Sequence, residues 1–464
     1  MKIYNTRSHK IEEFEPINPP KVMMYTCGPT VYSFAHIGNL RTYIMEDILE
    51  KSLNYIGFNV TRAMNITDVG HLTGDSDDGE DKMVNSAKEE KKTVLDIAKF
   101  YTDAFFNDCA ELNIAKPEII SPATDNIPEY IKIIEKLIDE GKAYEAGGNV
   151  YFDTTKIDNY YSLTNNIEDE LMSGVRETVE EDQNKRNKAD FVLWFTKSKF
   201  DDQELKWDSP FGLGYPGWHI ECSGISLKYL GEDLDIHCGG VDNIFPHHTN
   251  EIAQTEAFIG RKWCNYWVHG EFLNDATGKM SKSKGGTLTL QTLKDNGYNP
   301  LSYRFMCLNS HYRNQLVFTY ESLDIAQNSY NKLKSRVLSL NEYGELPDEN
   351  TFNDWNNKFK TFLEEDLNTA NAITLIYDLL KSDVKDNAKL ALIKLWDEVL
   401  SLDLTEKAVE TVSDKHDYIM EMIEKRNNAK ANKDYTEADR IRDELLNEGI
   451  ALKDTREGTT YEIN

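Results

Sequence analysis

Two short segments of the chain carry side chains that can hold phosphate groups. The first is His36-Ile37-Gly38-Asn39, and the second is the run Gly278-Lys279-Met280-Ser281-Lys282 with the small and basic residues that follow it. In the first, a helix N-terminus with a glycine lets backbone amides approach phosphate oxygens, and imidazole and amide side chains add neutral donors. In the second, lysines beside small residues in a loop suit the binding of a triphosphate. Each also has a plain structural explanation, an ordinary helix start and a basic surface loop.

The elements predicted around the first segment form a βαβ unit. Residues 22–26 form a β-type run, and Leu40, Ile44 and Ile48 then recur at helical spacing. A second β-type run over residues 58–66 follows Gly57. Residues 205–266 return to a glycine- and aromatic-rich α/β character, which we interpret as the second half of the same sheet. A ligand site is therefore expected at the carboxyl ends of parallel strands.

The rest of the chain predicts several further modules, because 464 residues exceed what one hydrophobic core usually serves. Residues 167–199 are mostly charged or polar and predict a solvated insertion. After about residue 290 the apolar residues recur three and four apart, as in Leu375, Ile376 and Leu379, which predicts a helical bundle. A linker around residues 406–414 precedes a small final module.

Composition limits the cellular context and the partners. The six cysteines are scattered without a local CxxC pair, which argues against a secreted disulfide framework and leaves reduced thiols or metal ligands. We find no run of about 18 apolar residues and no signal core, so we expect a cytoplasmic protein without a membrane partner. The formal charge of −28 means that any bound RNA must be attracted by local basic patches.

Together, the two phosphate-binding segments resemble the HIGH and KMSKS signatures of class I aminoacyl-tRNA synthetases. The second match is complete, whereas Asn39 stands in place of the second histidine of the first signature and can still donate a hydrogen bond. Residues 25–32, 217–223 and 245–251 resemble the cysteine-specific branch, the cysteinyl-tRNA synthetase family. The resemblance covers nearly the full length and weakens in the charged insertion.

The resemblance implies one zinc ion per chain, held by Cys27, Cys222, His247 and Glu251. Such a mixed sulfur, nitrogen and oxygen set suits zinc. We expect His247 and Glu251, four residues apart, on one helix face, and both cysteines at strand ends. His248 competes for the role of His247, since its spacing from Glu251 also suits a helix.

The remaining site residues also follow from the resemblance. Thr67 and Trp218 are expected to line a cysteine pocket, and Asp242 to face the ribose of ATP. His36 and Asn39 would hold phosphates, Lys279 and Lys282 would stabilise the departing pyrophosphate, and Mg²⁺ would accompany ATP. His71 receives no role.

The implied function is ATP-dependent activation of L-cysteine to cysteinyl-adenylate and its transfer to the 3′ end of tRNA(Cys), by a monomer. The implied fold is α/β, with a Rossmann-like catalytic domain in two halves (1–116 and 205–266) around a connective insertion (117–204). A KMSKS-bearing stem-contact region (267–322), a helical bundle (323–405) and a C-terminal anticodon-binding domain (412–464) follow. Residues 425–442 carry six basic against three acidic side chains, either an RNA-binding face or an ordinary solvated one.

Three other functions stay open at this point. A related ligase joins activated cysteine to an amino sugar but lacks the anticodon module. An inactive paralogue could keep the fold, although His36, Lys279, Lys282 and the four metal ligands are intact. An unrelated nucleotidyltransferase would explain the phosphate-binding segments but not the set of two cysteines, one histidine and one glutamate.

Overall fold

The structure is a computed structural model of the chain. It describes residues 1–69, 93–164, 182–197, 205–275, 278–279, 288–343, 348–407, 412–431, 434–447, 450–455 and 458–463. The chain divides into two compact units, Met1–Thr405 and Glu406–Asn464. None of the helices in these ranges combines the length and apolar character that a membrane span needs.

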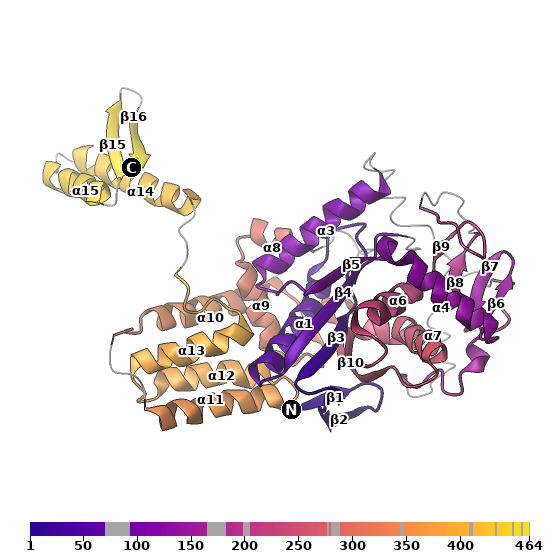
Figure 1. Cartoon of the computed structure of the whole chain (residues 1–464). Helices are drawn as coiled ribbons and strands as arrows, with labels where there is room; N and C mark the ends of the chain where they lie inside the picture. Colours follow the sequence, from indigo (N-terminus) through magenta and orange to yellow (C-terminus); the bar gives the residue numbers. More distant parts are fainter. Residues whose placement is uncertain are drawn as a thin grey trace. The chain divides into compact units, whose positions relative to one another are not determined.

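A five-stranded parallel sheet forms the centre of the first unit (Figure 1). Its strand order is β11 (Cys264–Gly270), β10 (Leu234–Gly240), β3 (Lys21–Thr26), β4 (Asn59–Ile66) and β5 (Ile119–Pro122). The predicted βαβ unit is confirmed, since β3 leads through α1 (Ile37–Tyr55) to β4 and pairs with it in parallel. The later part of the chain completes the sheet, because β10 pairs with both β3 and β11.

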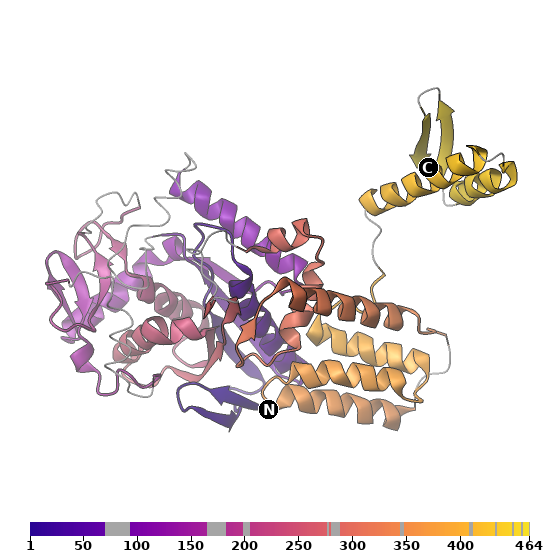
Figure 2. The same ribbon diagram turned by 180° about the vertical axis from the view of Figure 1, so that it is seen from behind.

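Helices cover both faces of this sheet because its strands are apolar on both sides. Met24 packs into a core with α1, whereas its neighbour Tyr25 packs into a second core with α6 (Trp218–Leu230) and α7 (Thr249–Ile259). Successive side chains of a strand point to opposite faces, so α1 and the α6–α7 pair lie on opposite sides of the sheet (Figure 2). The carboxyl ends of β3 and β10 lie between them.

The N-terminal hairpin, β1 (Lys2–Asn5) with β2 (Lys10–Glu13), continues this α/β body beside β11, since Thr6 N donates to Trp267 O over 2.8 Å. α3 (Val94–Glu111) precedes β5. The connection between the sheet halves contains η1 (Ala123–Asn126), α4 (Ile127–Asp139), η2 (Thr154–Lys156) and an antiparallel sheet of β6 (Ala143–Ala146), β7 (Asn149–Phe152), β8 (Phe191–Phe195) and β9 (Tyr215–Pro216).

The prediction of a solvated insertion over residues 167–199 is wrong for residues 190–195, whereas residues 182–189 are exposed or half-buried. All of β8 is buried, because its aromatic and aliphatic residues pack both on α6 and inside the antiparallel sheet. Asp190, directly before β8, is also buried and accepts hydrogen bonds from Thr154 and Tyr144. Residues 165–181 lie outside the described part.

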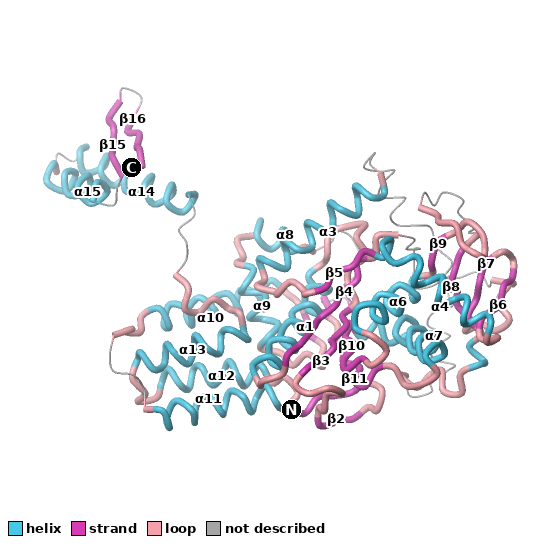
Figure 3. Tube along the Cα trace, in the orientation of Figure 1, coloured by secondary structure: helices cyan, strands magenta, loops and turns pink. Residues whose placement is uncertain are grey.

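Beyond the sheet, the first unit becomes mainly helical, in agreement with the 3.6-residue spacing (Figure 3). A small sheet contains β12 (Leu273–Asp275), β13 (Gly278–Lys279) and β14 (Leu316–Val317). Between β13 and β14 the chain forms α8 (Leu290–Asp295) and α9 (Pro300–Leu308). The bundle comprises α10 (Tyr320–Leu338), α11 (Glu349–Glu364), α12 (Thr369–Lys381) and α13 (Asp386–Leu400).

The second unit has its own small core. It contains α14 (Val412–Ala431), α15 (Tyr435–Asn447) and an antiparallel hairpin of β15 (Ile450–Thr455) and β16 (Gly458–Ile463). Ile419, Ile423 and Leu445 pack with the hairpin. Two of the six basic residues counted over residues 425–442 are poorly placed to contact RNA. Arg426 is buried, and Arg440 is paired with Glu437 and Glu444.

Candidate active site

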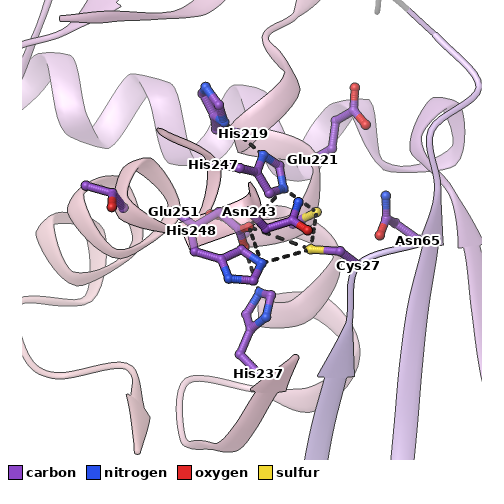
Figure 4. Close-up of polar contacts among 12 residues, drawn as sticks. Cys27, Asn65, His219, Glu221, His237, Asn243, His247, His248 and Glu251 are labelled. Carbon is purple, nitrogen blue, oxygen red and sulfur yellow. Dashed lines mark hydrogen bonds and ion pairs between the residues drawn. The ribbon is translucent and has the colours of Figure 1, made fainter. Parts of the chain in front are cut away.

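Four side chains with metal-binding atoms meet at the carboxyl end of β3. They are Cys27, Cys222, His247 and Glu251, and one donor atom from each lies within 4.8 Å of all the others (Figure 4). Cys27 directly follows β3, where the chain leaves the sheet. His247 lies in the short segment η4 (Ile244–His248), and Glu251 lies in the first turn of α7, so the predicted spacing of four does bring these two side chains together.

The expectation that Cys222 comes from a strand end is wrong. It lies inside α6, which begins at Trp218 directly after β9 and the N-cap Gly217. A side chain at Gly217 would need a Cβ 2.1 Å from the carbonyl oxygen of Val192, so glycine is required for this close approach to β8. The helix then carries Cys222 to the sheet from the face opposite to α1.

The separations within the cluster are those of groups that share one small space. Cys27 Sγ lies 3.9 Å from Cys222 Sγ and 4.0 Å from Glu251 Oε1. His247 Nε2 lies 3.5 Å from Cys222 Sγ and 3.0 Å from Glu251 Oε1. Tetrahedral zinc, with ligands at about 2.0–2.3 Å, holds its donor atoms at similar mutual distances. The donor set and its spacing therefore fit zinc.

Electrostatics favours the ionised form of Cys222 and Glu251, whereas burial and the neighbouring Cys222 and Glu251 raise the pKa of Cys27 well above its usual range. Burial opposes charge on Cys222, but its hydrogen bond with Cys27 and the nearby His247 lower the pKa of Cys222 to about 6. Burial is likewise outweighed at Glu251, whose pKa falls to about 2 beside His237 and His247. Glu251 and Cys222 together overcome burial and raise the pKa of His247 to about 10. A bound cation would replace the proton on His247.

A second set of donors shares two members with the first. Cys27, His237, His248 and Glu251 also bring one donor atom each within 4.8 Å of one another. His248 Nε2 lies 3.3 Å from Cys27 Sγ, so the competitor recognised in the sequence does reach the cluster. His237 Nε2 lies 2.9 Å from Glu251 Oε2, on the side of the carboxylate away from His247.

Several histidines around the cluster were not predicted from the sequence. His219 Nδ1 lies 2.9 Å from His247 Nδ1, and His269 Nε2 lies 2.8 Å from His248 Nδ1. These contacts fix the orientation of the inner imidazoles, which is the usual role of groups behind a metal site. The signal in the sequence was weak, because His219, His237 and His269 come from three separate elements.

Of the two predicted cysteine-pocket residues, Trp218 contacts the cluster, and Thr67 contacts Glu221, the residue before Cys222 in α6. The indole of Trp218 stacks on the imidazole of His247, with ring centroids 4.1 Å apart. Thr67 follows β4 and is buried, and its hydroxyl donates to Glu221 Oε2 over 2.9 Å. A cavity of about 480 Å³ is lined by Val241, Phe245 and His269 among others, and His269 contacts His248.

The segment His36–Asn39 caps α1 at the same sheet edge. His36 is the N-cap, and its Nδ1 accepts a hydrogen bond from the backbone N–H of Asn39. In return, Asn39 Oδ1 accepts from the backbone N–H of His36. A Cβ on Gly38 would lie 2.9 Å from the His36 ring, so glycine lets that ring keep its capping position. Asp242 lies exposed just beyond β10, in η3 (Val241–Asn243).

Of the two predicted lysines, Lys279 lies in β13, which pairs with β12 at Asn274. Lys282 and His71 lie outside the described residues. Metal donors and a helix N-terminus thus meet at the carboxyl edge of one parallel sheet, where a sulfur-containing ligand and a phosphate-containing ligand could be held side by side.

Comparison with known proteins agrees with this arrangement. Residues 13–328 match the model of the family described as tRNA synthetases class I (C) catalytic domain. A cysteine--tRNA ligase of Treponema denticola is 46% identical over 490 residues, which cover 99% of each chain. A cysteine--tRNA ligase of Borreliella burgdorferi is 44% identical over 478 residues, covering 99% of this chain and 98% of that one.

Among solved structures, the methionyl-tRNA synthetase of Mycobacterium tuberculosis in complex with methionyl-adenylate has a TM-score of 0.56 at 13% identity. The likeness covers 82% of this chain and 90% of that one and shows a shared fold. Fold and family model define the catalytic domain of a class I aminoacyl-tRNA synthetase, a ligase that acts with tRNA, ATP and an amino acid. Within that class, the chain belongs to the family of cysteine--tRNA ligases.

Proposed function

We propose that this protein activates L-cysteine with ATP and transfers it to tRNA(Cys), and that it selects cysteine through a zinc ion held by Cys27, Cys222, His247 and Glu251. The main support is that this donor cluster and the start of α1 lie at the same edge of the parallel sheet. Bound zinc would offer a position to the substrate thiolate, a soft and strong ligand, whereas the hydroxyl of serine stays protonated and binds poorly.

The protein's own residues position the substrates. Trp218 and Thr67 border the cysteine side chain beside the cluster. His36, Asn39 and the backbone amides at the start of α1 hold ATP phosphates, and Asp242 accepts hydrogen bonds from the ribose. Mg²⁺ accompanies ATP and shields its charge.

The reaction has two balanced steps. The cysteine carboxylate attacks the α-phosphorus of ATP, forms a P–O bond and releases pyrophosphate, whose charge Lys279 and Lys282 stabilise. A terminal ribose hydroxyl of tRNA(Cys) then attacks the carbonyl carbon of cysteinyl-adenylate, gives up its proton and releases AMP. Holding both reactants in place removes most of the entropic barrier of each step.

Each domain of the chain has a part in this function. Residues 1–116 and 205–266 form the catalytic domain around the connective insertion at 117–204. The stem-contact region at 267–322, the bundle at 323–405 and the anticodon-binding domain at 412–464 position tRNA. We place the enzyme in the cytoplasm as a monomer.

Two measurements on the full-length protein test the proposal. We expect about one zinc per chain by elemental analysis, and ATP–pyrophosphate exchange that depends on cysteine and not on serine. Absence of exchange with a zinc-loaded protein would contradict the activity. Equal exchange with serine, or unchanged selectivity after complete removal of the metal, would contradict the zinc-based selection.

A further inference from the structure

Three aromatic rings form an exposed cluster in the first unit. Phe34 lies 5.9 Å from Phe100 and 5.1 Å from Tyr101, and the latter two are 5.0 Å apart, all measured between ring centroids and all edge-to-face. Phe34 and Phe100 are each 45% exposed. Large side chains of this kind contribute most to folding when buried, so their joint exposure needs an explanation outside the core.

Phe34 links the cluster to the candidate active site through its place in the chain. Phe34 belongs to the loop that leads from Cys27 to His36, and thus from the donor cluster to the phosphate-binding helix start. This loop is tied to the end of β4, since Val31 N donates to Thr67 O and Thr67 N donates to Pro29 O.

The other two rings are held in place by α3. The buried face of this helix, with Val94, Ile97 and Ala98, packs on Val31 and Ile66, which belong to the same loop and to β4. Phe34 and α3 are therefore fixed to one framework. The rings stand on well-packed elements, as a preformed binding surface requires.

Electrostatic attraction alone does not explain how an RNA strand would bind at this cluster. The whole chain carries −28, and Lys99 on the same helix is paired with Asp103 over 2.8 Å. Stacking of a base on an aromatic ring does not depend on net charge, and unpaired RNA ends are commonly held in this way. The tRNA end must reach the space between Cys27 and His36 for transfer to occur.

We propose that the cluster of Phe34, Phe100 and Tyr101 is a stacking site for an unpaired nucleobase of the tRNA 3′ end. The inference rests on the proposed function, because it assumes that a tRNA end enters this site. It assigns a binding role to Phe34, a residue that takes no part in the activation step.

The test compares variants that separate stacking from apolar packing. Phe34→Leu keeps an apolar side chain without a ring, and Phe34→Trp keeps the ring. Tyr343→Leu removes an aromatic ring that is 82% exposed elsewhere on the first unit and serves as the matched control. For each full-length variant, KM for tRNA and kcat are measured in cysteine charging, together with tRNA-independent pyrophosphate exchange.

We expect Phe34→Leu to raise KM for tRNA about tenfold, within the range for loss of one stacked base, while pyrophosphate exchange stays unchanged. Phe34→Trp and Tyr343→Leu should retain the KM of the parent protein. In direct binding, the difference between Phe34→Leu and the parent should vanish for tRNA shortened by its unpaired 3′ nucleotides.

An unchanged KM for tRNA in Phe34→Leu would overturn the inference, and so would equal losses in Phe34→Leu and Phe34→Trp. A binding defect that persists with the shortened tRNA would overturn it as well. These outcomes differ from failure of the proposed function, which would be seen in the parent protein as absence of cysteine-dependent exchange.

Discussion

At the scale of single residues, the donor cluster depends on side chains from elements distant in sequence, so each donor can be tested by itself. Cys222→Ser replaces a thiolate whose pKa is about 6 with a hydroxyl that stays protonated, and a metal loses a strong ligand. We expect loss of most bound zinc and a fall in cysteine-dependent pyrophosphate exchange on the order of 100-fold or more.

The matched control for this prediction is Cys307→Ser, which changes a buried thiol in α9 that belongs to neither donor set. Its zinc content should equal that of the parent protein. Full zinc retention and normal exchange in Cys222→Ser would remove Cys222 from the site.

A second residue-scale prediction concerns Glu46, which is fully buried in α1. Neither of its carboxylate oxygens has a hydrogen-bond partner among the described residues. Burial, only partly offset by Arg62, raises the pKa of Glu46 from 4.5 to about 8. Between these values the unfolded chain loses the proton while the folded chain keeps it, so the free energy of unfolding falls as pH rises.

Glu46→Gln removes this ionisation. The variant should gain on the order of 3 kcal/mol over the parent at pH 8 and much less near pH 5, as read from urea unfolding at both values. Parallel pH dependence in the two proteins would show that Glu46 ionises freely in the folded state.

Sequence reasoning identified Cys27, Cys222, His247 and Glu251 through motif resemblance, and the fold brings these four together. It could not find His237, because one histidine in a buried strand gives no local signal until β10 is packed against α7. It also placed Cys222 at a strand end, because the short strand β9 and the helix start after Gly217 leave almost no periodicity to read.

At the scale of elements, a buried ionic group joins α1 to the helical region. Arg304 in α9 donates to Asp47 in α1 over 2.6 Å and also to the carbonyl oxygens of Leu400 and Leu112, with no exposure of either charged side chain. Lys51 adds a second bond to Asp47. This group fixes α1, and with it the N-cap His36, to α9 and to the end of α13.

Arg304→Met should therefore destabilise the first unit by about 3–5 kcal/mol, because Asp47 would stay buried with only Lys51 and the backbone N–H of Ala115 as partners. Arg261→Met is the control, since Arg261 pairs with Asp233 at the surface and should cost under about 1 kcal/mol. Denaturant midpoints decide the matter, and equal effects of the two substitutions would contradict the role given to Arg304.

Elements with a strong periodic pattern were predictable, and those that depend on tertiary context were not. The βαβ unit and the bundle helices have clear spacing, as in Leu375 and Leu379 of α12. The burial of β8 could not be predicted, because it depends on β7, β9 and α6, which are short or distant in sequence.

At the scale of the whole molecule, all site residues named above lie in the first unit, and the second unit forms a separate core. A chain that ends at Thr405 should keep cysteine-dependent pyrophosphate exchange within about twofold, because activation needs only that unit. Its charging of tRNA should fall by at least about tenfold if the second unit supplies RNA contacts. Loss of exchange in a folded truncated chain, judged by its circular dichroism, would contradict this division of labour.

The central claim is that the donor cluster and the start of α1 serve attachment of cysteine to tRNA. The most direct measurement is the attachment of labelled cysteine, with labelled serine as control, to unfractionated tRNA in the presence of ATP and Mg²⁺. We predict that cysteine is attached and serine is not. Attachment of neither amino acid by a folded, zinc-loaded protein, or of both equally, would contradict the account.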